Sequence, residues 1–109
     1  MAETFQRTSL AVTSTETDAY QCPSATTAVV LSCLVANVDG TNSDDITAKI
    51  TNSSNTEQSR IASTITVPAD ASLELIPNKL VLEAGEKIRL TGAAASGRLS
   101  ATISILDIT

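Results

Sequence analysis

Apolar and polar residues alternate with a period of two along most of this chain. In "ITAKIT", residues 46–51, the isoleucines and the alanine fall on one side, and the threonines and the lysine fall on the other. Residues 61–67 and 99–105 repeat this pattern. Side chains of a β-strand point alternately to opposite faces, whereas a helix repeats every 3.6 residues. No long stretch has the helical period, so the pattern predicts strands throughout.

Turn-forming residues separate the alternating stretches. Asn, Asp, Ser, Gly and Pro recur between strands at a spacing of about 8–12 residues, which is typical of a sandwich or barrel. We predict an all-β protein, an antiparallel β-sandwich (jelly-roll-like or Ig-like) of about eight short strands. The 109 residues suit a single domain, residues 1–109. The only aromatic residues are Phe5 and Tyr20, so the core must be built from Val, Ile, Leu and Ala.

The most apolar stretch is residues 27–38, in which both sides of the predicted strand are apolar. Two sets of side chains fall on its opposite sides: Val29, Leu31, Cys33 and Val35, and Val30, Leu34 and Ala36. A strand of this kind is typical of a sheet that is covered on both faces. A domain of this size rarely has two cores, so we expect one side to meet a second subunit. Val30 and Leu34 are the interface candidates.

Residues 79–90, "KLVLEAGEKIRL", place charged side chains around a tight turn. Gly85 can adopt the positive φ of such a turn, so we predict a hairpin closed by residues 83–86. Its core-facing residues would be Leu80, Leu82, Ile88 and Leu90. Lys87 and Arg89 share the opposite side, where they would face water or a neighbouring subunit. They are therefore further interface candidates.

The chain contains no histidine. Histidine is the side chain best suited to proton transfer near neutral pH, and its absence excludes Ser-His and Cys-His nucleophiles. The four glycines form no phosphate-binding loop, and two aromatic residues cannot build a platform for sugar rings. We therefore expect no catalytic residues, no cofactor and no enzymatic activity.

The net charge of -5 argues against a nucleic-acid partner, because phosphate binding needs clustered Lys and Arg. No apolar run reaches the roughly 18 residues of a membrane span. The first ten residues lack the basic and apolar regions of a signal peptide. We expect a protein that is made in a cytosol and binds neither nucleic acid nor membrane.

The segment "DGTNSDD" is the best metal candidate. Asp39, Thr41, Ser43 and Asp45 supply side-chain oxygens at alternate positions, as a hard cation such as Ca²⁺ requires. The segment lacks the full twelve-residue calcium-loop pattern, and an ordinary hairpin loop has the same composition. A loop without metal is the favoured interpretation.

The two cysteines, Cys22 and Cys33, are expected to be free thiols in a cytosolic chain. If a turn at residues 23–25 joined two paired strands, the thiols would lie roughly 20 Å apart, too far for a disulfide. An internal bridge would require strands that do not pair in this way. A contact between subunits through Cys22 is a further alternative.

Five short motifs carry a family resemblance. They are Cys22-Pro23-Ser24, Leu34-Val35-Ala36-Asn37, Val67-Pro68-Ala69, the stretch from Leu80 to Ile88, and Asp107-Ile108-Thr109. In this order they resemble small virion structural proteins of tailed bacteriophages, over nearly the whole chain. One departure is Cys22, where that family more often has an aliphatic residue. The departure leaves open a special role for this thiol, such as an inter-subunit disulfide.

The resemblance implies a non-enzymatic structural β-sandwich of the virion that assembles as a trimer or ring. Its expected partners are its own copies and other virion proteins, such as the major capsid protein or neck and tail proteins. A capsid cement or decoration protein is the favoured interpretation. A neck or tail accessory protein (collar, adaptor or fibre attachment) is the first alternative, and a receptor- or glycan-binding module is the second.

Overall fold

The computed structural model describes residues 2–76, 78–94 and 97–109. Within these residues all regular secondary structure is β-strand. Nine strands follow one another: β1 (Glu3–Val12), β2 (Thr17–Gln21), β3 (Thr27–Asn37), β4 (Asp44–Thr51), β5 (Glu57–Val67), β6 (Ser72–Glu74), β7 (Leu80–Leu82), β8 (Lys87–Gly92) and β9 (Leu99–Ile108). They form two packed antiparallel sheets, so the predicted β-sandwich is confirmed, with one strand more than expected.

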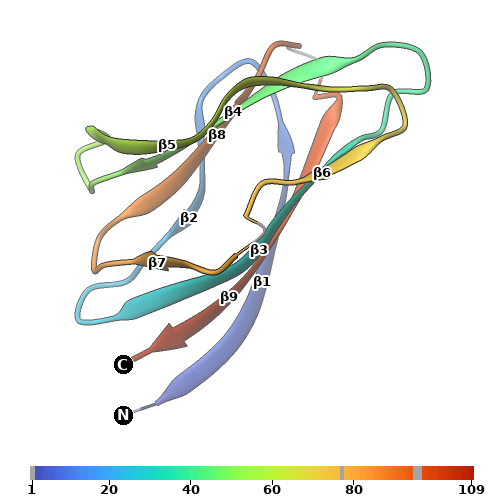
Figure 1. Cartoon of the computed structure of the whole chain (residues 1–109). Helices are drawn as coiled ribbons and strands as arrows, with labels where there is room; N and C mark the ends of the chain where they lie inside the picture. Colours follow the sequence, from blue (N-terminus) through green and yellow to red (C-terminus); the bar gives the residue numbers. More distant parts are fainter. Residues whose placement is uncertain (1, 77, 95–96) are drawn as a thin grey trace.

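The first sheet has the strand order β1-β9-β3-β6, and β7 also pairs with β3. The second sheet has the order β2-β8-β4-β5. Every pairing in both sheets is antiparallel. The sheets face each other, and both chain termini lie at one end of the first sheet, on β1 and β9 (Figure 1). In this order β1 is a free edge of the first sheet.

The hairpin predicted for residues 79–90 is wrong. β7 pairs with β3 in the first sheet, whereas β8 pairs with β2 and β4 in the second. Residues 83–86 therefore carry the chain from one sheet to the other. Gly85 makes this turn with a φ of 83°, and Leu82 and Ile88 face the core from opposite sheets. In this stretch alternation predicted that Leu82, Ile88 and Leu90 face the core, but it does not specify the partner of a strand.

A second crossing runs from β2 to β3 through residues 22–26. The two crossings lie side by side, because backbone hydrogen bonds join them. The Gly85 amide donates to the Cys22 carbonyl at 2.9 Å, and the Cys22 amide donates to the Glu86 carbonyl at 2.8 Å. Both connections therefore close the same end of the sandwich.

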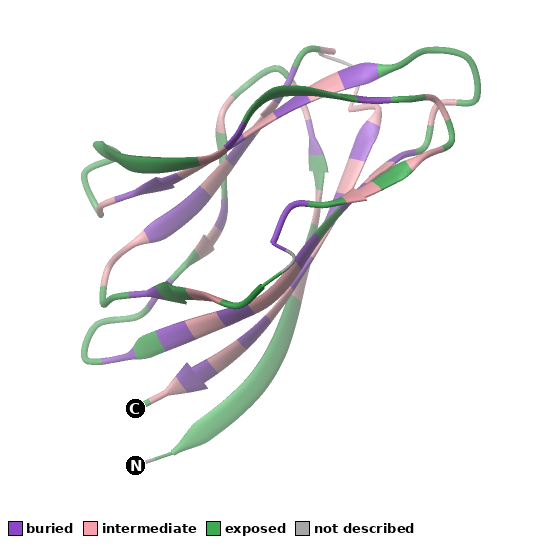
Figure 2. Ribbon diagram, viewed as in Figure 1, coloured by how far each residue is buried: buried purple, intermediate pink, exposed green. Residues whose placement is uncertain are grey.

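The core between the sheets is aliphatic, as predicted. Its largest fully buried side chains come from both sheets: Ile46, Leu82, Ile88, Leu90, Leu99, Ile103, Ile105, Val12, Val30, Val35 and Val67. Buried residues alternate with more exposed ones along the central strands (Figure 2). Neither aromatic residue is part of this buried set, since Phe5 is exposed and Tyr20 is half-buried. Burial of this aliphatic surface is the main stabilising term of the fold.

Candidate functional site

Lys87 and Arg89 lie on the outer face of the second sheet, because Ile88 and Leu90, their neighbours on β8, face the core. Their charges are already paired within the chain. The Arg89 guanidinium lies 2.8 Å from Glu16 Oε1 through Nη1 and 2.7 Å from Asp18 Oδ1 through Nε.

Lys87 is held in the same way. Its Nζ lies 3.1 Å from Asp18 Oδ2 and donates to Asn55 Oδ1 at 2.9 Å. Glu86, in contrast, accepts a hydrogen bond from the Glu83 amide. The cations of this stretch are therefore paired with carboxylates from the segment before β2 and from β2, not with those of the adjacent turn.

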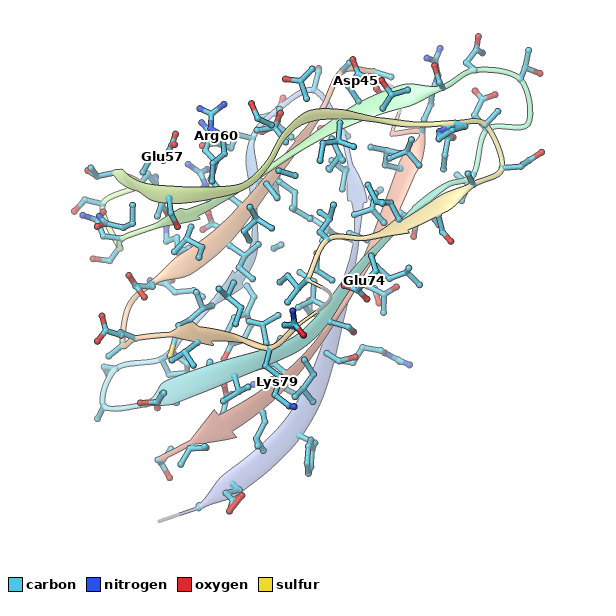
Figure 3. All side chains as sticks on the ribbon, viewed as in Figure 1. Asp45, Glu57, Arg60, Glu74 and Lys79 are labelled. Carbon is cyan, nitrogen blue, oxygen red and sulfur yellow. The ribbon has the colours of Figure 1, made fainter. Side chains whose placement is uncertain are left out.

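The ion pairs continue across the second sheet. Lys49 Nζ lies 3.0 Å from Glu16 Oε2 and 3.8 Å from Glu57 Oε1, and Glu57 also pairs with Arg60 at 3.0 Å. Figure 3 shows Glu57 and Arg60 next to each other, pointing away from the core. The hydrogen bond from Arg60 holds the pKa of Glu57 below its usual value. We call these seven side chains the ion-pair face: Glu16, Asp18, Lys49, Glu57, Arg60, Lys87 and Arg89.

Replacing Glu16 with alanine should lower the free energy of unfolding by about 1 kcal/mol, because this carboxylate bridges Lys49 and Arg89. Urea unfolding at low and high ionic strength measures the effect, and salt should reduce it. Glu83→Ala is the control, because Glu83 is an exposed carboxylate outside the ion-pair face. A loss for Glu16→Ala that is equal at both salt concentrations would contradict the electrostatic explanation.

The outer face of the first sheet carries an apolar row. Phe5 on β1 lies opposite Leu106 on β9, Leu106 lies opposite Val29 on β3, and Val29 lies opposite Val81 on β7. Directly opposite residues of antiparallel strands share a face, so the four side chains form one line across the sheet. Phe5 is 73% exposed and Val81 is 57% exposed, whereas the two central members are half-buried. We call this line the apolar row.

Leu34 lies on the same outer face, because it is opposite Thr102 of β9. It is 42% exposed, as expected for an interface candidate. Its predicted contact with a second subunit stays a prediction.

The placement of Val30 on the outer face is wrong, because its side chain is fully buried in the core. The register of β3 with β9 shifts between Val30 and Ser32. This bulge adds one residue, so Val30 and Cys33, three positions apart, both face inward. An added residue reverses the alternation beyond it, and the apolar pattern of this strand did not reveal the shift.

Cys22 is buried, with 1% of its surface exposed, and its Sγ lies 3.3 Å from the Thr26 carbonyl oxygen. Both cysteines are free and buried, as expected for two reduced thiols. Burial, together with the nearby Asp107 carboxylate, raises the pKa of the Cys22 thiol. Burial raises the pKa of Cys33 to about 12. The Cys22 thiol faces the interior, which is unfavourable for an inter-subunit disulfide, and that bridge stays a prediction.

Both native thiols should resist a thiol-specific reagent while the protein is folded and react once urea unfolds it. The reagent needs an accessible thiolate, and burial removes both the access and the ionisation. Counting labelled thiols by mass spectrometry before and after unfolding measures this. Ser24→Cys is the matched control, because Ser24 is exposed two residues from Cys22 and should be labelled at once. Equally fast labelling of Cys22 in the folded protein would contradict its burial.

The candidate metal loop is held by its own hydrogen bonds. Asp39 Oδ1 accepts from the amides of Thr41 and Asn42 at 2.8 and 2.9 Å, and its Oδ2 lies 3.3 Å from Arg98 Nε. These amide bonds lower the pKa of Asp39. Asp45 points away from the sandwich and accepts from the Thr66 hydroxyl at 2.8 Å (Figure 3).

The remaining candidate ligands, Thr41 and Ser43, are exposed. Among the described residues no three or more His, Cys, Asp or Glu side chains gather as a metal site. Asp39 accepts hydrogen bonds from its own loop, and Asp45 accepts one from Thr66 of the neighbouring strand β5.

A polar group at the end of the core was not predicted. Asp107 continues the inward series of β9 and is buried. Its two carboxylate oxygens accept hydrogen bonds from the Tyr20 hydroxyl and from Gln6 Nε2. Burial and this carboxylate raise the pKa of Tyr20. The inward period of β9 could have revealed Asp107, but its partners come from two other strands.

Three shallow grooves are open on the described surface. The groove beside Cys22 is lined by no charged side chain, the groove beside Ile61 by Arg60, and the groove beside Ile108 by Glu83. In the part of the chain that the structure describes, no helix is long and apolar enough to span a membrane. No protein-family model matches the chain, and no curated protein matches it significantly.

Proposed function

We propose that this protein is a non-enzymatic structural component of a tailed-bacteriophage virion. It binds its own copies and other virion proteins, and a capsid cement or decoration protein fits it best. The observation that carries the binding role is the exposed apolar row on the first sheet. The virion context comes from the resemblance of the sequence motifs.

The two outer faces differ in what they can offer a partner. On the ion-pair face the cations have carboxylates of the same chain within 4 Å, so a partner would gain little from those charges. The apolar row spans four neighbouring strands, about 14 Å at the usual strand spacing. Exposed apolar surface of this kind marks protein contacts, since covering it removes apolar area from water.

A further observation bears on the glycan-binding alternative. Tyr20 is tied to Asp107, which leaves Phe5 as the one freely exposed ring. A single ring is a poor platform for a sugar, so the glycan-binding alternative is weaker. A neck or tail position would use the same apolar row.

Imaging of intact particles tests this proposal, with the copy number as the readout. Density spread over the capsid lattice supports a cement protein, and density confined to the neck or tail supports the alternative. Val81→Ser should weaken binding to particles that lack the protein, because Val81 ends the apolar row. Ile65→Ser is the matched control, since Ile65 is 41% exposed on the second sheet. A protein absent from purified particles and unable to bind them would refute the proposal.

A further inference from the structure

Strand β1 is a free edge that lacks most of the usual protection against pairing. It runs for 10 residues and contains no proline and no glycine. Its register with β9 is constant from Glu3 to Val12, so no bulge turns the strand away. Proteins usually blunt such edges with prolines, bulges, lysines or short strands. Figure 1 shows the N-terminal part of β1 with no strand on its far side.

The hydrogen-bond pattern identifies the backbone groups that point to this free edge. Ala2 and Thr109 exchange both of their backbone hydrogen bonds, at 3.3 and 2.9 Å. Such pairs alternate with non-bonded pairs along an antiparallel ladder, so the even-numbered residues of β1 bond β9. The odd-numbered residues direct their N–H and C=O groups outward: Glu3, Phe5, Arg7, Ser9 and Ala11.

The side chains of this edge have a self-complementary order. Glu3, Phe5 and Arg7 alternate along the strand and share the outer face with the apolar row. All three are exposed, and Phe5 is the most exposed large apolar side chain of the described residues. An acid, an apolar residue and a base at equal spacing match a second copy of themselves when that copy runs in the opposite direction.

We propose that a second copy of this chain pairs with β1 in antiparallel fashion, about a two-fold axis at Phe5. Glu3 then lies opposite Arg7 of the partner subunit, and the reverse pair forms on the other side of the axis. Phe5 lies opposite Phe5 of the partner subunit. The outward backbone groups of both edges become hydrogen-bonded, and the apolar row continues from one copy into the other.

Other two-fold registers lack this complementarity. An axis at Arg7 places two arginines opposite each other, and an axis at Glu3 places two glutamates opposite each other. Like charges directly opposite on paired strands are destabilising. An axis at Gln6 places Phe5 opposite Arg7 and leaves Glu3 opposite Ser9. The register at Phe5 pairs both charges and both aromatic rings.

This inference deepens the proposed function and rests only on its self-association. It names a second copy as one partner and β1 as the contact. The contact is two-fold, so the trimer or ring expected from the resemblance would need a second contact elsewhere on the molecule.

Sedimentation of charge variants tests the register. The untagged protein should show a mass that rises with concentration from 11.3 kDa toward twice that value. Arg7→Glu and Glu3→Arg should each weaken the dimer about ten-fold, because each replaces two attractive pairs by two repulsive ones. The double variant with both substitutions exchanges the charges and should restore the wild-type affinity. Restoration is the decisive result, since neither substitution alone could produce it.

Cross-linking tests the position of the axis. Phe5→Cys should form a disulfide-linked dimer under mild oxidation, since hydrogen-bonded antiparallel pairs place their Cα atoms about 5.5 Å apart. Ser9→Cys is the matched control on the same edge. Its two thiols would lie about 26 Å apart in this register and should not cross-link.

Three outcomes would overturn the inference. They are a monomer throughout the micromolar to millimolar range, a dimer that the single charge variants leave unchanged, and cross-linking of Ser9→Cys but not of Phe5→Cys. None of these outcomes tests the virion assignment, which depends on binding to particles. A β1 dimer that is absent from particles would, conversely, refute the virion role and leave the contact intact.

Discussion

Ile103→Ala is expected to lower the free energy of unfolding by about 3–4 kcal/mol, the largest effect of a single truncation in this protein. Ile103 is fully buried on β9, between β1 and β3. Its truncation removes apolar contacts and leaves a cavity that two neighbouring strands hold open. Small domains have only about 5–15 kcal/mol of stability, so this loss is a large fraction of the total. Urea unfolding followed by circular dichroism measures it.

The matched control for this prediction is Thr102→Ala, one position earlier on the same strand. Thr102 points to the outer face and is half-buried. Its truncation should cost less than about 1 kcal/mol, as is usual outside the core. Equal losses for the two variants would show that β9 does not alternate between core and surface as described.

Asn37→Ala should cost about 3 kcal/mol, the second largest expected effect. The buried Asn37 side chain donates to the carbonyl oxygens of Asn42 and Val67, at 2.9 and 3.0 Å, and accepts from the Asp39 amide at 2.9 Å. It therefore ties the end of β3 to the following loop and to the end of β5. Its removal leaves the buried Val67 carbonyl and two partly buried backbone groups without these partners, and an unpaired buried group costs more than the hydrogen bond itself contributes.

Asn42→Ala is the control for this side chain. Asn42 is exposed, and its amide group makes only a 3.4 Å contact with Asp39. The carbonyl that Asn37 binds belongs to the backbone, so the substitution leaves that bond in place. A loss below about 0.5 kcal/mol is expected in thermal or urea unfolding. If Asn42→Ala lowered the free energy of unfolding more than Asn37→Ala does, the stabilising contacts would belong to the loop and not to the buried amide.

The ion-pair face shows which features of a candidate site the local sequence can predict. The alternation of β8 predicted that Lys87 and Arg89 lie on the side opposite Ile88 and Leu90, and they do. Lys87 does not face water, however, because only 8% of its surface is exposed. The alternation did not reveal their partners, because Glu16 and Asp18 lie about seventy residues earlier and meet them only through the pairing of β2 with β8. Ion pairs between distant segments depend on strand order, which no local pattern encodes.

The sequence by itself determined that this protein is all-β with an aliphatic core, because alternation predicts strands and only two residues are aromatic. It also determined the inward residues of β4 and β9, because the two-residue period of a strand is a local property of the backbone. Gly85 was recognisable as a turn residue for the same reason, since its positive φ is a local requirement.

Tertiary structure alone decided which strands pair, and strand pairing in turn decided which side chains form each outer face. The turn after Leu82 joins two sheets instead of closing a hairpin, and the bulge after Val30 sends that side chain into the core. Cys22 is buried because the two crossings pack against each other. Each outcome depends on contacts between segments far apart in the chain. The free energy of such contacts depends on the whole packed sandwich, so the residue pattern along one strand cannot predict it.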